Sequence, residues 1–179
     1  MNYIKKIFGR LDILVNNAGW APVTTLGDVK QQEIEMVFSI NTHAVFDLTQ
    51  ESLPLLKETQ GNIVNISSTA AAMPLATMSV YSGSKAAVNA FGLSWTKELA
   101  PYGIRVNTVS PGPIETPIYD KTELSDEEMQ AHRQRVTSMV PLSRFGTVEE
   151  VAPAVLFLVS DKASYMTGVE FAVDGGMRA

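Results

Sequence analysis

The chain has 179 residues, of which 45% are apolar and 18% are charged, and its net charge is −5 at pH 7. This length suits a single domain over residues 1–179 with a sizeable core. The acidic balance and the lack of a basic cluster argue against a nucleic-acid partner. The absence of cysteine excludes disulfides and thiolate metal sites, so the cytoplasm is the simplest location. His43 and His132 do not form a ligand cluster, and no metal site is expected.

The N-terminus carries Lys5, Lys6 and Arg10 ahead of a short apolar run at 11–15, which Asp12 interrupts. This run is too short for the apolar core of a signal peptide and far too short to span a membrane. We therefore interpret it as the end of a helix followed by a buried strand, with no membrane partner.

Apolar runs alternate with stretches of helical period along the rest of the chain. Strands are expected at 11–16, 61–67 and 104–110 and in a segment ending at 171–173, and helices at 31–57 and 82–100. Capping boxes at Ser125 with Glu128 and at Thr147 with Glu150 predict two further helix starts. Strands that alternate with helices imply right-handed crossovers, so the chain is expected to form a three-layer α/β fold around a parallel sheet.

Pro54 and Pro153 lie inside expected helices. A proline removes one backbone donor from the helix, so a bend is expected at Pro153, and Pro54 raises the same question.

Tyr81 and Lys85 are four residues apart, and Ser68 precedes Tyr81 by thirteen residues at the end of an expected strand. The i, i+4 spacing places the phenol and the ammonium on one face of a helix. A neighbouring cation lowers the pKa of a phenol and makes it usable as a general acid or base near neutral pH. The Ser68 hydroxyl could hold a substrate oxygen beside it. Taken alone, the Tyr–Lys pair is also compatible with a solvated helix face.

The order of several motifs is more specific than any one of them. The motifs are NNAG at 16–19, Asn41 in SINTHAVF, Ser68 in NISS, Tyr81 with Lys85, PGPIET at 111–116, PLSRFG at 141–146 and the stretch 166–176. This set resembles the short-chain dehydrogenase/reductase family, and its last member, the stretch 166–176, resembles the branch of 3-oxoacyl-carrier-protein reductases and glucose dehydrogenases. The resemblance covers nearly the whole chain.

The resemblance implies a catalytic set of Asn41, Ser68, Tyr81 and Lys85. Tyr81 would exchange a proton with the substrate oxygen, and Ser68 would hold that oxygen. Lys85 would lower the pKa of Tyr81 and bond the nicotinamide ribose, and Asn41 would hold a water in the proton relay. The residues alone leave another interpretation of Asn41 open, because asparagine also breaks or caps helices.

The same resemblance implies NAD(H) or NADP(H) as the cofactor, which carries the hydride. Residues expected along the adenosine side are Asn17, Ala18 and Gly19. Residues expected to border the nicotinamide are Pro111, Gly112, Ile114 and Thr116. Without the resemblance, Gly19 is also compatible with a simple turn, and residues 111–113 are also compatible with an ordinary loop.

The segment 114–140 is expected to cover the substrate as a lid. Ile118, Tyr119, Met129 and Met139 either line the substrate pocket or pack a lid helix onto the body, and the sequence leaves both interpretations open.

The chain departs from the family pattern at the phosphate-binding loop, because no TGxxxGxG stretch occurs in it. The resemblance therefore implies a Rossmann-like sheet that is the C-terminal portion of a doubly wound fold, with the first βαβαβ half absent. The strand at 11–15 would then be an exposed parallel edge, which favours pairing with another chain. We expect this chain alone to bind dinucleotide weakly or not at all, and to bury the edge against another copy as a homo-dimer or tetramer.

Two interpretations of Met1 are open: the chain is a fragment of a longer enzyme, or it is a short product. The first predicts an NAD(P)-dependent short-chain oxidoreductase that interconverts a small-molecule alcohol and a carbonyl. The alternative is a catalytically inactive oligomerisation or scaffold protein derived from such an enzyme.

Overall fold

A four-stranded parallel sheet forms the centre of the computed structural model, which describes residues 1–118 and 124–179. The strands follow the order of the chain across the sheet: β1 (Ile13–Asn16), β2 (Asn62–Ile66), β3 (Arg105–Pro111) and β4 (Glu170–Val173). Each expected strand is present within one or two residues of its predicted bounds. The expectation of a parallel, Rossmann-like α/β sheet is confirmed.

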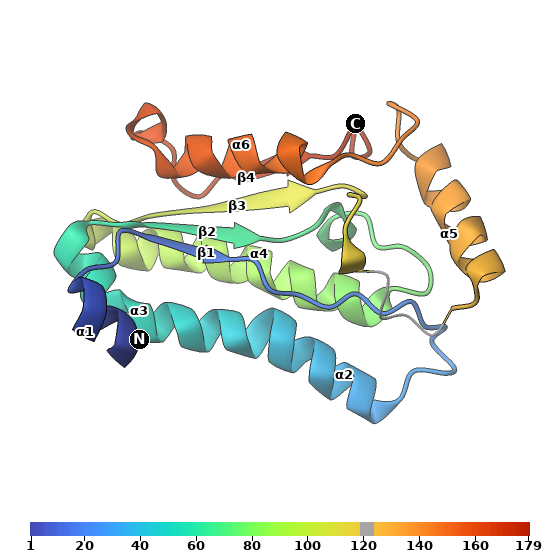
Figure 1. Ribbon diagram of the computed structural model, residues 1–179, viewed down its shortest axis with the longest axis horizontal. Coiled ribbons are helices and arrows are strands. Elements are labelled where there is room, and N and C mark those ends of the chain that lie inside the picture. Colours follow the sequence, from blue (N-terminus) through green and yellow to red (C-terminus); the bar gives the residue numbers. More distant parts are fainter. Residues whose placement is uncertain (119–123) are drawn as a thin grey trace.

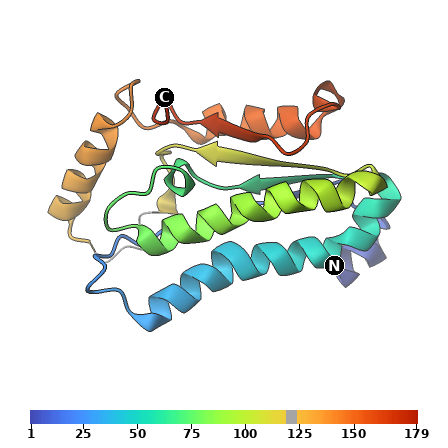
Figure 2. The ribbon, with the colours of Figure 1, turned by 180° about the vertical axis from the view of Figure 1, so that it is seen from behind.

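Helices cover both faces of this sheet and its carboxyl end (Figure 1). A continuous rod of α2 (Gln31–Phe38), a π-helical turn (Ser39–His43) and α3 (Ala44–Thr59) lies beside α4 (Ser79–Leu99) on one face, as Figure 2 shows from behind. The opposite face carries α6 (Val148–Val159), and α5 (Asp126–Ser138) stands beyond the carboxyl ends of the strands. Further helical segments among the described residues include α1 (Asn2–Phe8) and the 3₁₀ turns Thr69–Ala71, Ala100–Tyr102 and Asp161–Ala163.

The helix starts follow the expected capping chemistry. Ser125 Oγ accepts from the Glu128 amide at 3.3 Å, and Glu128 Oε2 accepts from the Ser125 amide at 2.9 Å. Glu150 Oε2 likewise accepts from the Thr147 amide at 2.9 Å. These bonds satisfy amides that a helix leaves free at its N-terminus, so both capping boxes fix where a helix begins.

The two faces of the sheet bury separate apolar clusters. Leu14, Ile63 and Val106 point toward α3 and α4, where Trp95 stacks on Phe91 with ring centroids 5.5 Å apart. On the opposite face the buried residues are Val64, Val109 and Leu158. Pro54 lies within α3 and Pro153 within α6, and both helices continue past their proline.

β1 forms one edge of the described sheet and is covered on one face only. Leu14 is buried, whereas Ile13 and Val15 on the opposite face are 42% and 40% exposed. The expected edge strand is thus confirmed, and apolar side chains lie uncovered beside it. In a parallel sheet both faces are ordinarily buried, so this edge is an unusual part of the surface.

None of the described helices is both long enough and apolar enough to cross a membrane.

Candidate active site at the carboxyl ends of the strands

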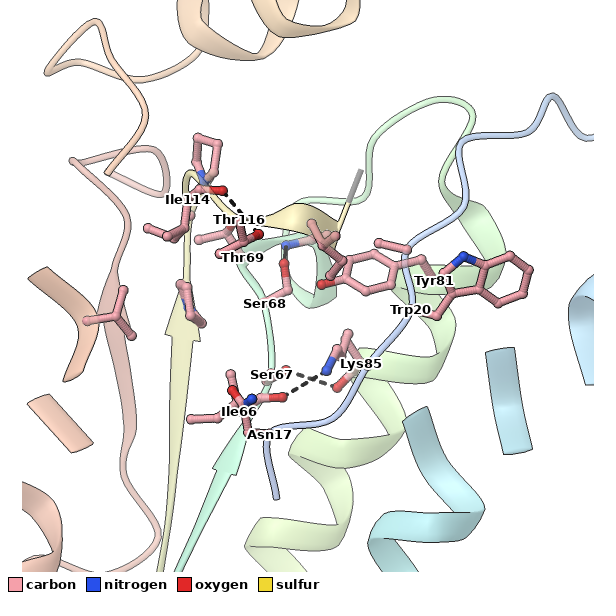
Figure 3. A pocket seen from close by; sticks show the side chains of 18 of the residues that line it. Asn17, Trp20, Ile66, Ser67, Ser68, Thr69, Tyr81, Lys85, Ile114 and Thr116 are labelled. Carbon is pink, nitrogen blue, oxygen red and sulfur yellow. Dashed lines mark hydrogen bonds between the residues drawn. The ribbon is translucent and has the colours of Figure 1, made fainter. Parts of the chain in front are cut away.

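A cavity of about 1230 Å³ opens at the carboxyl ends of β1, β2 and β3. Ligands of open α/β sheets bind in this position, because the loops that follow the strands converge there. Ser68, Tyr81 and Lys85 all line the cavity, and Figure 3 shows their side chains in one part of it. The sequence separates these residues by up to seventeen positions, and the fold brings them together.

Ser68 lies just beyond the end of β2. Its backbone is extended, with φ −165° and ψ 153°, and its Oγ accepts a hydrogen bond from the Ala70 amide at 3.1 Å. Ser68 therefore caps the 3₁₀ turn that follows it. The bond fixes the side-chain oxygen while its own proton stays available as a donor.

Tyr81 lies in the first turn of α4 and is almost fully buried. Its ring packs with Ala21, Ala70 and Met78 in a small apolar cluster. In Figure 3 the phenol oxygen points toward the part of the cavity that Ser68 borders. The ring is thus held by packing while its hydroxyl faces the cavity.

Lys85 lies one turn further along α4 and is only 4% exposed. Its Nζ donates to the Ile66 carbonyl at 2.8 Å and lies 5.9 Å from the centroid of the Tyr81 ring. Burial lowers the pKa of Lys85 from 10.5 to about 8, because the charged form loses solvation. The side chain therefore remains mainly a cation at neutral pH.

Asn41 lies in the π-helical turn, fully buried behind the cavity wall. Its Nδ2 donates to the Trp20 carbonyl at 2.9 Å and to Ser84 Oγ at 3.0 Å, and its Oδ1 accepts from the Trp20 amide at 2.9 Å. Both amide hydrogens are therefore used in holding the loop after β1 against α4. The interpretation of Asn41 as an interruption of the helix fits this geometry, because π turns within α-helices are common at functional sites.

The expected cofactor residues also border the cavity: Asn17, Ala18, Gly19, Pro111, Gly112, Ile114 and Thr116. Gly19 leaves space that a side chain would fill, since a Cβ there would lie 3.4 Å from Lys85 Nζ and 3.5 Å from Asn41 Oδ1. Gly112 allows the loop after β3 to pack closely on the backbone of Asp174, because a Cβ at this position would lie 2.8 Å from the Asp174 Cα. Among the described lining residues Lys85 is the one charged side chain. These groups fit the reactive end of a nicotinamide cofactor.

Among the described lid residues, the structure supports the pocket interpretation for Ile118 and supports neither interpretation for Met129 and Met139. Ile118 lines the cavity, and so does Val136 from α5. Met129 and Met139 do not belong to the described lining, and Met139 is exposed. Tyr119 lies outside the described residues.

Several residues of the described lining were not expected from the sequence, among them Trp20 and Met177. Trp20, next to Gly19, reaches the cavity, and Figure 3 labels it among the lining side chains. Met177 reaches it from the last turn of the chain. No sequence motif marked either residue, although the Asp174-Gly175-Gly176 turn before Met177 indicated that the chain folds back there.

Comparisons with known proteins agree with this architecture. The family model described as Enoyl-(Acyl carrier protein) reductase matches residues 1–178. The chain is 41% identical over 171 residues to the 3-oxoacyl-[acyl-carrier-protein] reductase FabG of Thermotoga maritima, an alignment that covers 95% of this chain and 67% of the relative. The chain belongs to the short-chain dehydrogenase/reductase family. A reductase of the same name from Buchnera aphidicola is 35% identical over 99% of the chain and 70% of its own length. An uncharacterized oxidoreductase of Methylorubrum extorquens is 38% identical over 96% of the chain and 67% of its own length.

Proposed function

We propose that this protein is an NAD(P)-dependent oxidoreductase that interconverts an alcohol and a carbonyl. The observation that carries the proposal is the arrangement of Ser68, Tyr81 and Lys85 around one cavity at the carboxyl ends of the strands. Membership of an oxidoreductase family supports it. The names of the relatives make a 3-oxoacyl thioester the first substrate class to test.

In the direction of reduction, Tyr81 donates its phenol proton to the carbonyl oxygen of the substrate. The Ser68 hydroxyl donates a hydrogen bond to the same oxygen and holds it beside Tyr81. Lys85, a cation 5.9 Å from the Tyr81 ring, stabilises the phenolate that remains. Asn41 acts by holding the loop after β1, and any water in a proton relay would have to bond an oxygen of Asn41, because both of its amide hydrogens are used.

A bound nicotinamide cofactor would give or accept the hydride. Asn17, Ala18 and Gly19 would lie along its adenosine side, and the residues at 111–116 would border its nicotinamide. Lys85 would bond its ribose through the space that Gly19 leaves open. We propose that the affinity of this chain alone is low, because the described lining offers a single cation to a ligand that carries two phosphates.

We further propose that the protein assembles as a homo-oligomer. Phe46 of α3 and Leu93 of α4 are 44% and 57% exposed, and Ile13 and Val15 lie uncovered beside the β1 edge. These side chains expose apolar surface on both faces of the molecule, and exposed apolar surface of this kind marks protein–protein contacts. The same observation favours the second candidate function, in which the chain acts only through assembly.

Titration of the chain with NADH and with NADPH, followed by nucleotide fluorescence, tests cofactor binding directly. Turnover of a 3-oxoacyl thioester by wild type and by Tyr81→Phe then separates the two candidate functions. The enzyme requires at least a hundredfold loss of turnover, with an unchanged sedimentation profile. Tyr165→Phe, at a fully exposed position, is the matched control. Equal behaviour of wild type and Tyr81→Phe would leave only the assembly function.

A further inference from the structure

The last turn of the chain forms a wall of the cavity. Gly175 and Gly176 after β4 have φ of +64° and +88°, a left-handed conformation that glycine adopts readily. A Cβ on Gly175 would lie 2.7 Å from Val140 Cγ1, so the turn also packs too tightly for a side chain. This turn delivers Met177 into the cavity, where the side chain is 6% exposed.

Met177 lies next to the proposed chemistry. Its Sδ is 3.8 Å from the hydroxyl oxygen of Thr69, and Thr69 directly follows Ser68. The same cavity is lined by further apolar side chains, which include Met73, Leu75, Met78, Ile118 and Val136. A group attached to the carbonyl carbon of a substrate would meet this apolar wall once Ser68 held the oxygen.

Arg178 ties the turn to the sheet. Its guanidinium pairs with Glu170 of β4, and its Nε lies 3.4 Å from Asp174 Oδ2. Glu170 Oε1 also accepts from the Ser110 hydroxyl at 2.7 Å, and Asp174 Oδ1 accepts from the Gly176 amide at 3.0 Å. Isolated ion pairs on the surface contribute little to stability. The pairs of Arg178 with Glu170 and Asp174 belong instead to a partly buried hydrogen-bond network, and this network fixes the backbone next to Met177.

We propose that Met177 determines substrate specificity and that Arg178 positions it, so that the C-terminal turn sets how large an apolar group fits beside Ser68. This inference rests on the proposed function for the identity of the substrate carbonyl. Methionine is unbranched and flexible, so the wall adapts to modest changes in the ligand but still limits its size.

The test measures binding of methyl ketones of increasing length to the apo protein. Butanone, 2-octanone and 2-undecanone are titrated against the fluorescence of Trp20, which lines the cavity, whereas the other tryptophan, Trp95, is buried in the core. Met177→Ala should raise the affinity ratio of the longest to the shortest ketone by about tenfold, the scale on which pockets discriminate small changes in apolar size. Met177→Phe should lower the ratio, and circular dichroism establishes that each variant is folded.

The matched control is Met139→Ala, an exposed position outside the described lining, which should leave the ratio unchanged. An unchanged ratio in folded Met177→Ala and Met177→Phe overturns the proposal, as does failure of any ketone to bind the wild type.

The positioning role of Arg178 needs its own readout. Arg178→Gln should shift the ratio in the direction of Met177→Ala, and Arg178→Lys should restore it in part. Added salt screens ion pairs, so it should move the wild-type ratio toward that of Arg178→Gln and leave the variant unaffected. Arg10→Gln breaks an exposed ion pair with Asp12 and serves as the control. Identical ratios in wild type and Arg178→Gln would remove Arg178 from the proposal.

The binding test does not depend on the cofactor. If the ratio shifts as expected but no variant turns over with NADH or NADPH, the proposed function fails and the pocket assignment stands. If the protein turns over and Met177→Ala leaves the ratio of kcat/KM between long and short ketones unchanged, only the inference about Met177 fails.

Discussion

Burial of Lys85 makes the stability of the protein depend on pH in an unusual direction. The pKa of this lysine falls from 10.5 to about 8 because the folded chain withdraws the ammonium from water. Between these two values the unfolded chain binds a proton that the folded chain has released. The free energy of unfolding therefore rises with pH through this window, and the cost of the buried charge is fully present below pH 8.

Lys85→Met removes the charge at nearly constant length and should abolish this dependence. Integrating the proton uptake from pH 7 to 9.5, with a pKa of about 8 in the folded chain and 10.5 in the unfolded chain, gives about 2 kcal/mol. The stability of the wild type should gain that amount relative to the variant across the interval. The variant also loses the bond to the Ile66 carbonyl, which costs about 1 kcal/mol at any pH. The slope with pH is therefore the informative quantity, rather than the difference at one pH.

Urea unfolding followed by circular dichroism at pH 7, 8, 9 and 9.5 measures the slope for both proteins. Lys97→Met makes the same change at an exposed position near the end of the same helix and should retain the wild-type slope. Parallel curves for wild type and Lys85→Met would refute the reasoning, because they would show that the buried ammonium is solvated as well as it is in the unfolded chain.

Three backbone positions, Gly92, Gly83 and Thr77, give further predictions. Gly92→Ala in α4 should lower the free energy of unfolding by about 1–2 kcal/mol, because its Cβ would lie 2.9 Å from the hydroxyl of buried Thr108. Gly83→Ala in the same helix, with nothing within 4 Å of its Cβ, should instead raise the free energy of unfolding by about 0.5–1 kcal/mol. Urea unfolding of both variants tests this, and changes of the same sign in the two variants would contradict the prediction. Thr77→Gly should raise the melting temperature by relieving about 1 kcal/mol of strain, because a β-branched residue at φ +70° is strongly disfavoured; an unchanged or lower melting temperature would show that the loop around Thr77 stores no such strain.

The sheet could be predicted because its signal is local. Short apolar runs separated by helical stretches allow few arrangements besides parallel strands with crossovers. Within the helix expected at 31–57, Asn41 was open to interpretation as a helix break, but no local pattern indicated that the break takes the form of the π turn Ser39–His43. The interruption depends on Asn41 bonding the main chain of Trp20, a contact between residues 21 positions apart.

Three polar members of the candidate site could be predicted, whereas most of its apolar wall could not. Ser68, Tyr81 and Lys85 belong to ordered motifs, and the fold places them together as expected. Met177 and Val136 carry no such motif, because an apolar residue that lines a cavity looks the same in sequence as one that packs a core. The path of the chain after β4 places Met177 in the cavity wall rather than in the core, and the position of α5 does the same for Val136.

The residues proposed for catalysis also hold the strand ends in place. The loop after β1 is bonded through Trp20 to Asn41, and the end of β2 is bonded through the Ile66 carbonyl to Lys85 Nζ. In return, Ser67 Oγ donates to the Lys85 carbonyl at 3.1 Å. These bonds join loops that carry the site to helices that pack on the sheet, so the positions of the reactive groups follow from the core below them. A site built on loops alone would lack this support, since loops have fewer buried contacts than the elements they connect. The hydrogen bond from Lys85 Nζ to the Ile66 carbonyl therefore offsets part of the free-energy cost of burying the ammonium and also fixes the end of β2 at the cavity.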